Sequence, residues 1–215
     1  MNNKAFTLTE ILVVLGLIIL TALIVIPNLI EDNKKLDIIS KWKNTYQNIE
    51  YVFSALNAQN TETDVMAFKK AKSVEEKENL LIELLNPYFR IIKPISADKK
   101  YKLYYLNGSE VKPEDDYNIK KFYEISSGKI IGIKWLNTAS NLTEVLPVAL
   151  ISIDLNGENK PNKWGYDVFG VNIFEGKIEP VGKSNDEFLM KSDCSKKGKG
   201  ISCSYYYYIY GGQLN

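Results

Sequence analysis

The chain has 215 residues, with 27 basic and 26 acidic side chains and a formal net charge of +1. This length accommodates one sizeable domain or two small ones. The balanced charge provides no global field for nucleic acid, and Arg90 is the sole arginine, so we expect no specific nucleic-acid binding. Histidine is absent, which excludes Ser–His and Cys–His chemistry, and no phosphate-binding loop motif occurs. We therefore expect a protein that is not an enzyme.

The N-terminus reads Asn-Asn-Lys-Ala-Phe-Thr-Leu-Thr-Glu over residues 2–10, and an uncharged run from Ile11 to Ile30 follows at once. Such a run is long enough to cross a lipid bilayer as a helix. An ionised carboxylate near the membrane centre costs on the order of 2.5 kcal/mol or more, so we expect Glu10 to have a partner. A secretory signal has its small-residue cleavage site after the apolar core, whereas Ala5 precedes it here. Cleavage after Ala5 would leave the apolar segment on the mature protein.

The order Phe6-Thr7-Leu8-Thr9-Glu10, followed by the apolar run, resembles the class III leader of type IV pilins and type II secretion pseudopilins. The resemblance covers roughly residues 1–30. It includes Pro27, where the family often has a helix-bending proline, and it departs from the family at Ala5, where glycine is usual. The fold that this resemblance implies is pilin-like, with the chain assembled into a helical filament.

The same resemblance implies how the N-terminus is processed and used. A prepilin peptidase would remove the leader peptide, residues 1–5, by cleaving between Ala5 and Phe6, and Phe6 would become N-methylated. In the family, the glutamate that matches Glu10 pairs with the free amine of a neighbouring subunit's first residue, here Phe6. The partners would be other copies, related pilin-like subunits and an inner-membrane assembly platform. The protein would be a single-pass protein of the bacterial inner membrane, with its head in the periplasm or outside the cell.

Glu10 also has a purely local interpretation. Thr7-Leu8-Thr9-Glu10 matches a capping box, in which the threonine side chain binds a helix amide and the glutamate binds the cap amide in return. A carboxylate near a helix N-terminus is also favoured by the helix dipole. The capping role and the assembly role are compatible.

The helical pattern continues past the transmembrane half, which we assign to residues 6–30. Apolar residues then recur at spacings of three and four, which predicts an amphipathic half over residues 31–57. Pro27 can kink this helix without ending it. The apolar positions of the second half are Leu36, Ile39, Trp42, Tyr46, Ile49, Val52, Phe53 and Leu56.

Residues 58–215 are predicted to form a globular α+β head with a C-terminal disulfide loop. A capping box at residues 73–76 predicts a helix, which Asn86-Pro87 should end. Asn107-Gly108 and Ser127-Gly128 predict hairpin turns. Short apolar or alternating runs predict strands at Tyr101 to Leu106, Asn118 to Ile125, Ile130 to Leu136, Val145 to Ile153, Val168 to Asn172, Lys177 to Pro180, and a last aromatic strand at Tyr205 to Tyr210. The expected fold is therefore a long N-terminal helix packed against a small antiparallel sheet.

Two cysteines, Cys194 and Cys203, lie close together near the C-terminus. Behind a membrane anchor, in an oxidising compartment, we expect one disulfide that closes a loop of about ten residues and contributes about 2–3 kcal/mol. The alternative is a pair of free or metal-binding thiols, although a closed zinc site would need carboxylates to complete it.

The segment from Asp154 to Asp167 is rich in oxygen-bearing side chains and turn-forming residues. Asp154 and Asn156 at alternate positions, with Asp167 at the end, suggest a Ca²⁺ loop. It is not an EF-hand, because Gly165 stands where the closing glutamate is needed. The alternative is an Asx-type turn without metal. Major pseudopilins are similar in the position of a calcium loop, but the similarity does not extend to individual ligands.

We expect the protein to be a structural subunit of a pilus-like filament, as a pseudopilin of a type II secretion-like system. One alternative is a minor type IV pilin for adhesion, motility or DNA uptake. Another is a membrane-tethered, calcium-dependent binding or adhesion protein, in which the helix serves only as an anchor.

Overall fold

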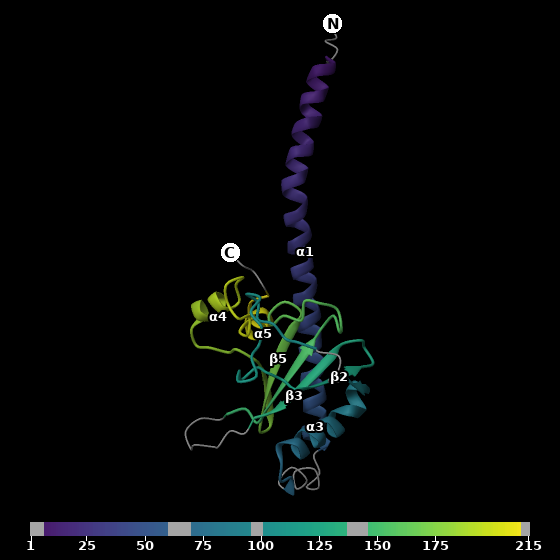
Figure 1. The fold of residues 1–215 in the computed structure, drawn as a ribbon, viewed down its shortest axis with the longest axis vertical. Coiled ribbons are helices and arrows are strands. Elements are labelled where there is room, and N and C mark those ends of the chain that lie inside the picture. Colours follow the sequence, from purple (N-terminus) through teal and green to yellow (C-terminus); the bar gives the residue numbers. More distant parts are fainter. Residues whose placement is uncertain (1–6, 60–69, 96–100, 137–145, 212–215) are drawn as a thin grey trace. The chain divides into compact units, whose positions relative to one another are not determined.

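The computed structural model describes residues 7–59, 70–95, 101–136 and 146–211. The chain divides into two compact units, Met1–Asp37 and Ile38–Asn215, and we call the second unit the head. The elements, labelled in part in Figure 1, are α1 (Leu8–Gln59), α3 (Val74–Phe89), β1 (Ile91–Pro94), β2 (Lys121–Ile125), β3 (Ile130–Trp135), β4 (Ala149–Asp154), β5 (Val168–Phe174), β6 (Lys177–Pro180), α4 (Glu187–Asp193) and α5 (Cys203–Tyr210). The helix α1 contributes residues to both units.

The head is built on a six-stranded antiparallel sheet in which each strand pairs with the next in the chain, in the order β1-β2-β3-β4-β5-β6. Glycines with positive φ occupy the tight turns between β2 and β3 and between β5 and β6. Gly128 has a φ of 75° and donates its N–H to the Ile125 carbonyl, which closes the predicted β2–β3 turn. Gly176, with a φ of 80°, turns β5 into β6. The head is therefore α+β, as the sequence predicts.

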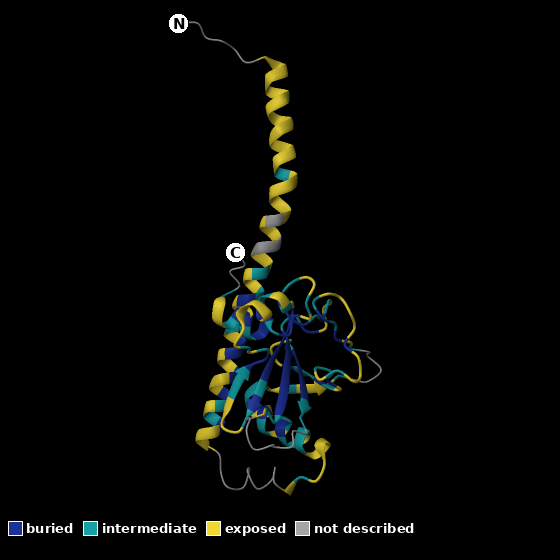
Figure 2. Cartoon of the chain, turned by 90° about the vertical axis from the view of Figure 1, so that its left-hand side faces the viewer, coloured by how far each residue is buried: buried dark blue, intermediate teal, exposed yellow. Residues whose placement is uncertain are grey.

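Both faces of the sheet are buried, and Figure 2 shows the central strands in the colour of buried residues. Successive residues of a strand point to opposite faces. On β4, Ala149, Ile151 and Ile153 join the core formed with the helices, whereas Leu150 joins a second core. The second core is covered by non-helical segments, from which Leu103, Tyr105, Val111, Ile119, Trp164 and Ile201 contribute. The late loops of the chain are therefore packed structures.

The head portion of α1 carries the predicted amphipathic stripe. Six of its apolar residues are buried, namely Ile39, Trp42, Tyr46, Ile49, Val52 and Leu56. Trp42 has no exposed surface, and its ring stacks on Phe169 of β5 with centroids 4.9 Å apart. Two of the eight predicted positions differ, since Phe53 is only half-buried and Leu36, which belongs to the first unit, is 56% exposed.

The predicted helix stop at Asn86-Pro87 is wrong, because α3 continues to Phe89. Pro87 lies in the last turn of α3 and removes one N–H donor there without ending the helix. The Asn86 carbonyl still accepts the N–H of Arg90 at 2.8 Å, and Arg90 ends the helix in a left-handed conformation. At the other end of α3, the capping box predicted for Ser73 and Glu76 is confirmed.

The predicted strand at Tyr205 to Tyr210 is also wrong, because this segment is the helix α5. Tyrosine favours strands, but that preference depends on packing and is readily overridden. The buried residues Cys203, Ser204, Tyr206 and Tyr207 fall on one helical face, and Gly211 ends the helix with a φ of 69°. The aromatic run therefore forms a short helix that buries Tyr206 and Tyr207 and leaves Tyr210 exposed.

Three further differences concern short segments. Tyr101–Leu106 forms only isolated bridges, because the backbone of Tyr104 bonds to Asn162 and Trp164 in the late loop. The turn at Asn107-Gly108 therefore joins non-strand segments. The sequence did not predict β1 or α4, which consist of 4 and 7 residues and are too short for a clear periodicity.

Candidate functional site

Three regions carry the residues singled out in the sequence: the start of α1, the loop between β4 and β5, and the disulfide near the C-terminus. The predicted cleavage residues Ala5 and Phe6 lie outside the described residues. Glu10 is described and lies in the first turn of α1.

At the start of α1, Glu10 and Thr7 form the predicted capping box. The carboxylate of Glu10 accepts the N–H and the hydroxyl of Thr7, each at 2.9 Å, and the N–H of Glu10 donates to the Thr7 hydroxyl oxygen at 3.3 Å. The local role of Glu10 is thus present in a single copy of the chain. It leaves the carboxylate exposed, with room for a donor in addition to the two from Thr7.

The helix behind Glu10 is exposed and apolar. The stretch Leu8–Pro27 comprises 20 residues, is long and apolar enough to cross a membrane, and buries none of them within the structure. Pro27 lies inside the helix without ending it, as the sequence predicts. This segment must find lipid or other helices to cover its side chains.

The loop from Asp154 to Asp167 joins the ends of two central strands. Asp154 is the last residue of β4 and pairs with Val168, the first residue of β5, so the hairpin brings the two aspartates to the same end of the sheet. Both carboxylates are buried, each with 2% of the residue exposed. Burial of two acidic groups without partners would be costly, so their hydrogen bonds decide what the loop does.

Protein donors reach all four carboxylate oxygens of this pair. Asp154 accepts the Tyr101 hydroxyl on one oxygen and the N–H of Asn156 on the other, the second at 3.0 Å. One oxygen of Asp167 accepts the Lys163 N–H at 2.5 Å. Its other oxygen accepts the Asn162 N–H and the Asn156 amide Nδ2, both at 3.0 Å. The three residues proposed from the sequence are therefore brought together in a turn closed by its own hydrogen bonds.

Two amide oxygens in the same loop lack a donor. Asn156 Oδ1 and Asn162 Oδ1 are buried and have no hydrogen-bond partner among the described residues. Asn162, which the sequence analysis did not single out, has a φ of 54° and is 8% exposed. Within the described residues there is no group of three or more His, Cys, Asp and Glu placed to hold a metal ion. The loop geometry thus matches the turn interpretation, with the two amide oxygens as its unsatisfied atoms.

Burial is the largest cause of the pKa shifts of Asp154 and Asp167. It raises the pKa of Asp154 to about 7, against the hydrogen bond from Tyr101, which lowers it, and with a further increase from the charge of Asp167. Burial likewise raises the pKa of Asp167, although the amides of Lys163 and Asn162 act in the opposite direction. The pKa of the Tyr101 hydroxyl is raised by burial and by the neighbouring Asp154. At neutral pH, Asp154 is therefore close to its titration midpoint.

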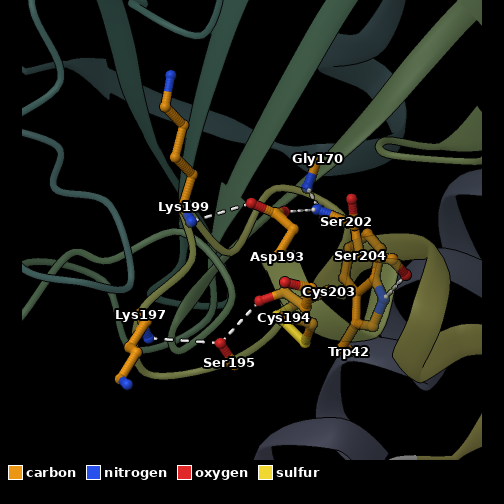
Figure 3. Close-up of a disulfide and its surroundings, with 11 residues drawn as sticks. Trp42, Gly170, Asp193, Cys194, Ser195, Lys197, Lys199, Ser202, Cys203 and Ser204 are labelled. Carbon is orange, nitrogen blue, oxygen red and sulfur yellow. Dashed lines mark hydrogen bonds between the residues drawn. A yellow bond between two sulfur atoms is a disulfide. The ribbon is translucent and has the colours of Figure 1, made fainter. Parts of the chain in front are cut away.

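The two cysteines form a disulfide, Cys194–Cys203, between the end of α4 and the start of α5 (Figure 3). The loop that it closes is held by Asp193, which accepts the N–H of Lys199 at 2.9 Å and that of Ser202 at 2.7 Å. The alternative of free thiols does not hold in this structure.

Ser204, beside the disulfide, connects α5 to two other elements of the head. Its carbonyl accepts the Trp42 indole N–H at 2.8 Å, and its hydroxyl accepts the Gly170 N–H at 2.9 Å (Figure 3). The disulfide segment is thereby fixed to α1 and to the inner strand β5.

Comparison of the chain with protein-family models, with characterised proteins and with solved structures gives no match.

Proposed function

We propose that this protein is a structural subunit of a pilus-like filament, of the pseudopilin type, held in a bacterial inner membrane by the first part of α1. The observation that carries the proposal is Glu10, a lone carboxylate in the first turn of an apolar helix, directly behind Phe6-Thr7-Leu8-Thr9. An ionised group at this position needs a cationic partner once the helix enters an apolar environment. The first amine of a second processed copy supplies one.

In the proposed mechanism, a charge pair sets the arrangement of the subunits, and the apolar surface of the helix holds them together. Cleavage after Ala5 exposes the amine of Phe6, and its pairing with Glu10 of another copy sets the stagger between subunits. The exposed apolar side chains of Leu8–Pro27 supply the cohesion, first with lipid and then with neighbouring helices. The Thr7–Glu10 capping box supports this role, because it fixes the position of the carboxylate at the helix start.

Two substitutions at the helix start test the proposal. Glu10→Gln removes the charge and is expected to leave the protein in the membrane but to abolish its incorporation into filaments, measured by crosslinking and by blotting of sheared fractions. Thr7→Val is the matched control, because it removes the capping hydroxyl and retains the carboxylate. We expect this variant to assemble, with helix capping weakened by about 1 kcal/mol.

The outcomes separate a filament subunit from a simple membrane tether. Normal incorporation of Glu10→Gln would overturn the proposal and leave α1 as an anchor. Equal loss of assembly in both variants would assign Glu10 to helix capping alone.

A further inference from the structure

The helix α4 presents two large apolar side chains to solvent. Phe188 is 76% exposed and Leu189 is 58% exposed, whereas Met190, the next residue, is buried in the head. The N-cap Asp186 fixes this turn, since its carboxylate accepts the N–H groups of Phe188 and Leu189 at 2.9 and 3.3 Å. The apolar pair is therefore held outward on an ordered helix.

Lysines surround this pair in the sequence. Residues 183–199 contain five lysines and three carboxylates, and one of the lysines, Lys183, pairs with Glu179 at 3.1 Å. Two of the carboxylates, Asp186 and Asp193, bind backbone amides of the segment. Lys196 and Lys197 are exposed in the loop closed by the disulfide, and Figure 3 shows the Lys197 side chain pointing away from the disulfide. We call Phe188, Leu189, Lys191, Lys196 and Lys197 the α4 patch.

Adjacent exposed apolar residues beside an excess of positive charge fit an anionic lipid surface. The apolar side chains enter the boundary between headgroups and acyl chains, and the ammonium groups are attracted to the lipid phosphates. A surface that combines exposed apolar side chains with positive charge matches an anionic bilayer. It matches the mixed-charge surface of another protein less well.

The helix α1 tethers the head to the membrane that carries such a surface. This step rests on the membrane anchor of the proposed function. The α4 patch is joined by the disulfide to α5, and α5 is bonded to Trp42 of α1. Pro27, the end of the apolar stretch, lies only fifteen residues before Trp42 in the sequence. The tether therefore gives the patch a high effective concentration at the bilayer, so that even a weak surface affinity populates the docked state.

We propose that the α4 patch docks on the anionic surface of the membrane that holds the chain, with Phe188 and Leu189 inserted and the lysines on the headgroups. The docked head is the form of the subunit before assembly, and the head must leave the lipid surface when the subunit enters a filament.

The test uses the full chain in vesicles of phosphatidylcholine, with or without phosphatidylglycerol, that carry bromine on their acyl chains as a fluorescence quencher. Phe188→Trp places a reporter in the patch, and the native tryptophans are corrected for with the wild-type protein. We expect this reporter to lose emission in brominated anionic vesicles, relative to unbrominated ones. Ile92→Trp is the matched control, because Ile92 is 59% exposed on the edge strand β1 and should lose none.

Charge dependence completes the test. Adding Lys196→Glu and Lys197→Glu to Phe188→Trp is expected to restore the emission, as is raising the salt concentration. Equal emission in brominated and unbrominated vesicles would overturn the proposal, and so would equal quenching in purely zwitterionic vesicles. A blue shift that follows the number of chains per vesicle, without quenching, would instead assign the patch to a second copy.

Flotation of the same vesicles separates this inference from the proposed function. A chain that floats with the vesicles but shows no quenching retains its anchor and overturns only the docking. A chain that does not float has lost the anchor on which the proposed function rests.

Discussion

At the scale of residues, Asp154 is a carboxyl group that is buried in the head. Burial raises its pKa to about 7, compared with 3.8 for the ordinary carboxyl. A carboxyl with a raised folded-state pKa binds its proton more tightly in the folded state. Its contribution to the free energy of unfolding is therefore fully present below about pH 4 and is lost as the pH rises to 7. At about 1.4 kcal/mol per pKa unit, that contribution is on the order of 4 kcal/mol.

Asp154→Asn tests this titration, because it removes the ionisable group while retaining an acceptor for the Asn156 amide. We expect the melting temperature of the variant to vary less between pH 4 and 7 than that of the wild type, and to exceed it at pH 8. Glu175→Gln, at an exposed carboxylate, is the control and should reproduce the wild-type profile. Parallel profiles for Asp154→Asn and the wild type would show that Asp154 is ionised throughout this range.

The second residue-scale prediction concerns the Asp154–Asp167 loop and calcium. Because all four carboxylate oxygens already have protein donors, we expect the full chain in detergent to melt at the same temperature in Ca²⁺ and in EDTA. A melting temperature that rises with Ca²⁺, and does not rise for Asp167→Asn, would assign the loop to a cation. In that case Asn156 Oδ1 and Asn162 Oδ1 would be its additional ligands.

At the scale of elements, the disulfide joins two short helices that have little core of their own. Reduction, or replacement of both Cys194 and Cys203 by serine, is expected to lower the free energy of unfolding by about 2–3 kcal/mol, because the unfolded chain regains the freedom of a loop of about ten residues. Denaturant titration of the full chain in detergent measures this change. A variant that unfolds at the wild-type denaturant concentration would show that the contacts of Trp42 and Gly170 with Ser204 suffice to hold α5.

The elements also show what sequence periodicity can and cannot predict. The long stripe of α1 and the β2–β3 hairpin were predictable, because a three-to-four spacing and a Ser-Gly turn each indicate one conformation. The helix α5 was not, because its buried face is defined by contacts with Trp42 and Gly170, which are distant in the chain. For the same reason, the aspartates of the loop were predictable as a group, whereas the donor Tyr101, 53 residues before Asp154 in the chain, was not. The unpaired Oδ1 of Asn162 was not predictable either, because the sequence does not indicate which buried atoms lack a donor.

At the scale of the whole molecule, the head contains the entire buried hydrophobic core of the described residues, since every member lies at Ile39 or later. We therefore expect a fragment that begins at Asn33 to be a soluble, folded monomer with an intact disulfide and near-wild-type thermal stability. Size-exclusion chromatography and circular dichroism check this. Further truncation, to begin at Lys43, removes Ile39 and Trp42 and should destabilise the fragment by at least about 3 kcal/mol. Equal stability of the two fragments would show that Trp42 contributes little to the head.

The bond between Trp42 and Ser204 has a mechanical consequence. When α1 is under tension, this hydrogen bond carries load into the head, together with the core contacts of Ile39 that precede it in the chain. From there the load passes through the Ser204 hydroxyl to Gly170 on β5, an inner strand that is paired on both sides, with β4 and with β6. An inner strand is hydrogen-bonded on both sides, so the load is shared among many hydrogen bonds. An edge strand can separate from the sheet by breaking one hydrogen bond at a time. A head attached to α1 in this way resists unfolding when the helix is pulled.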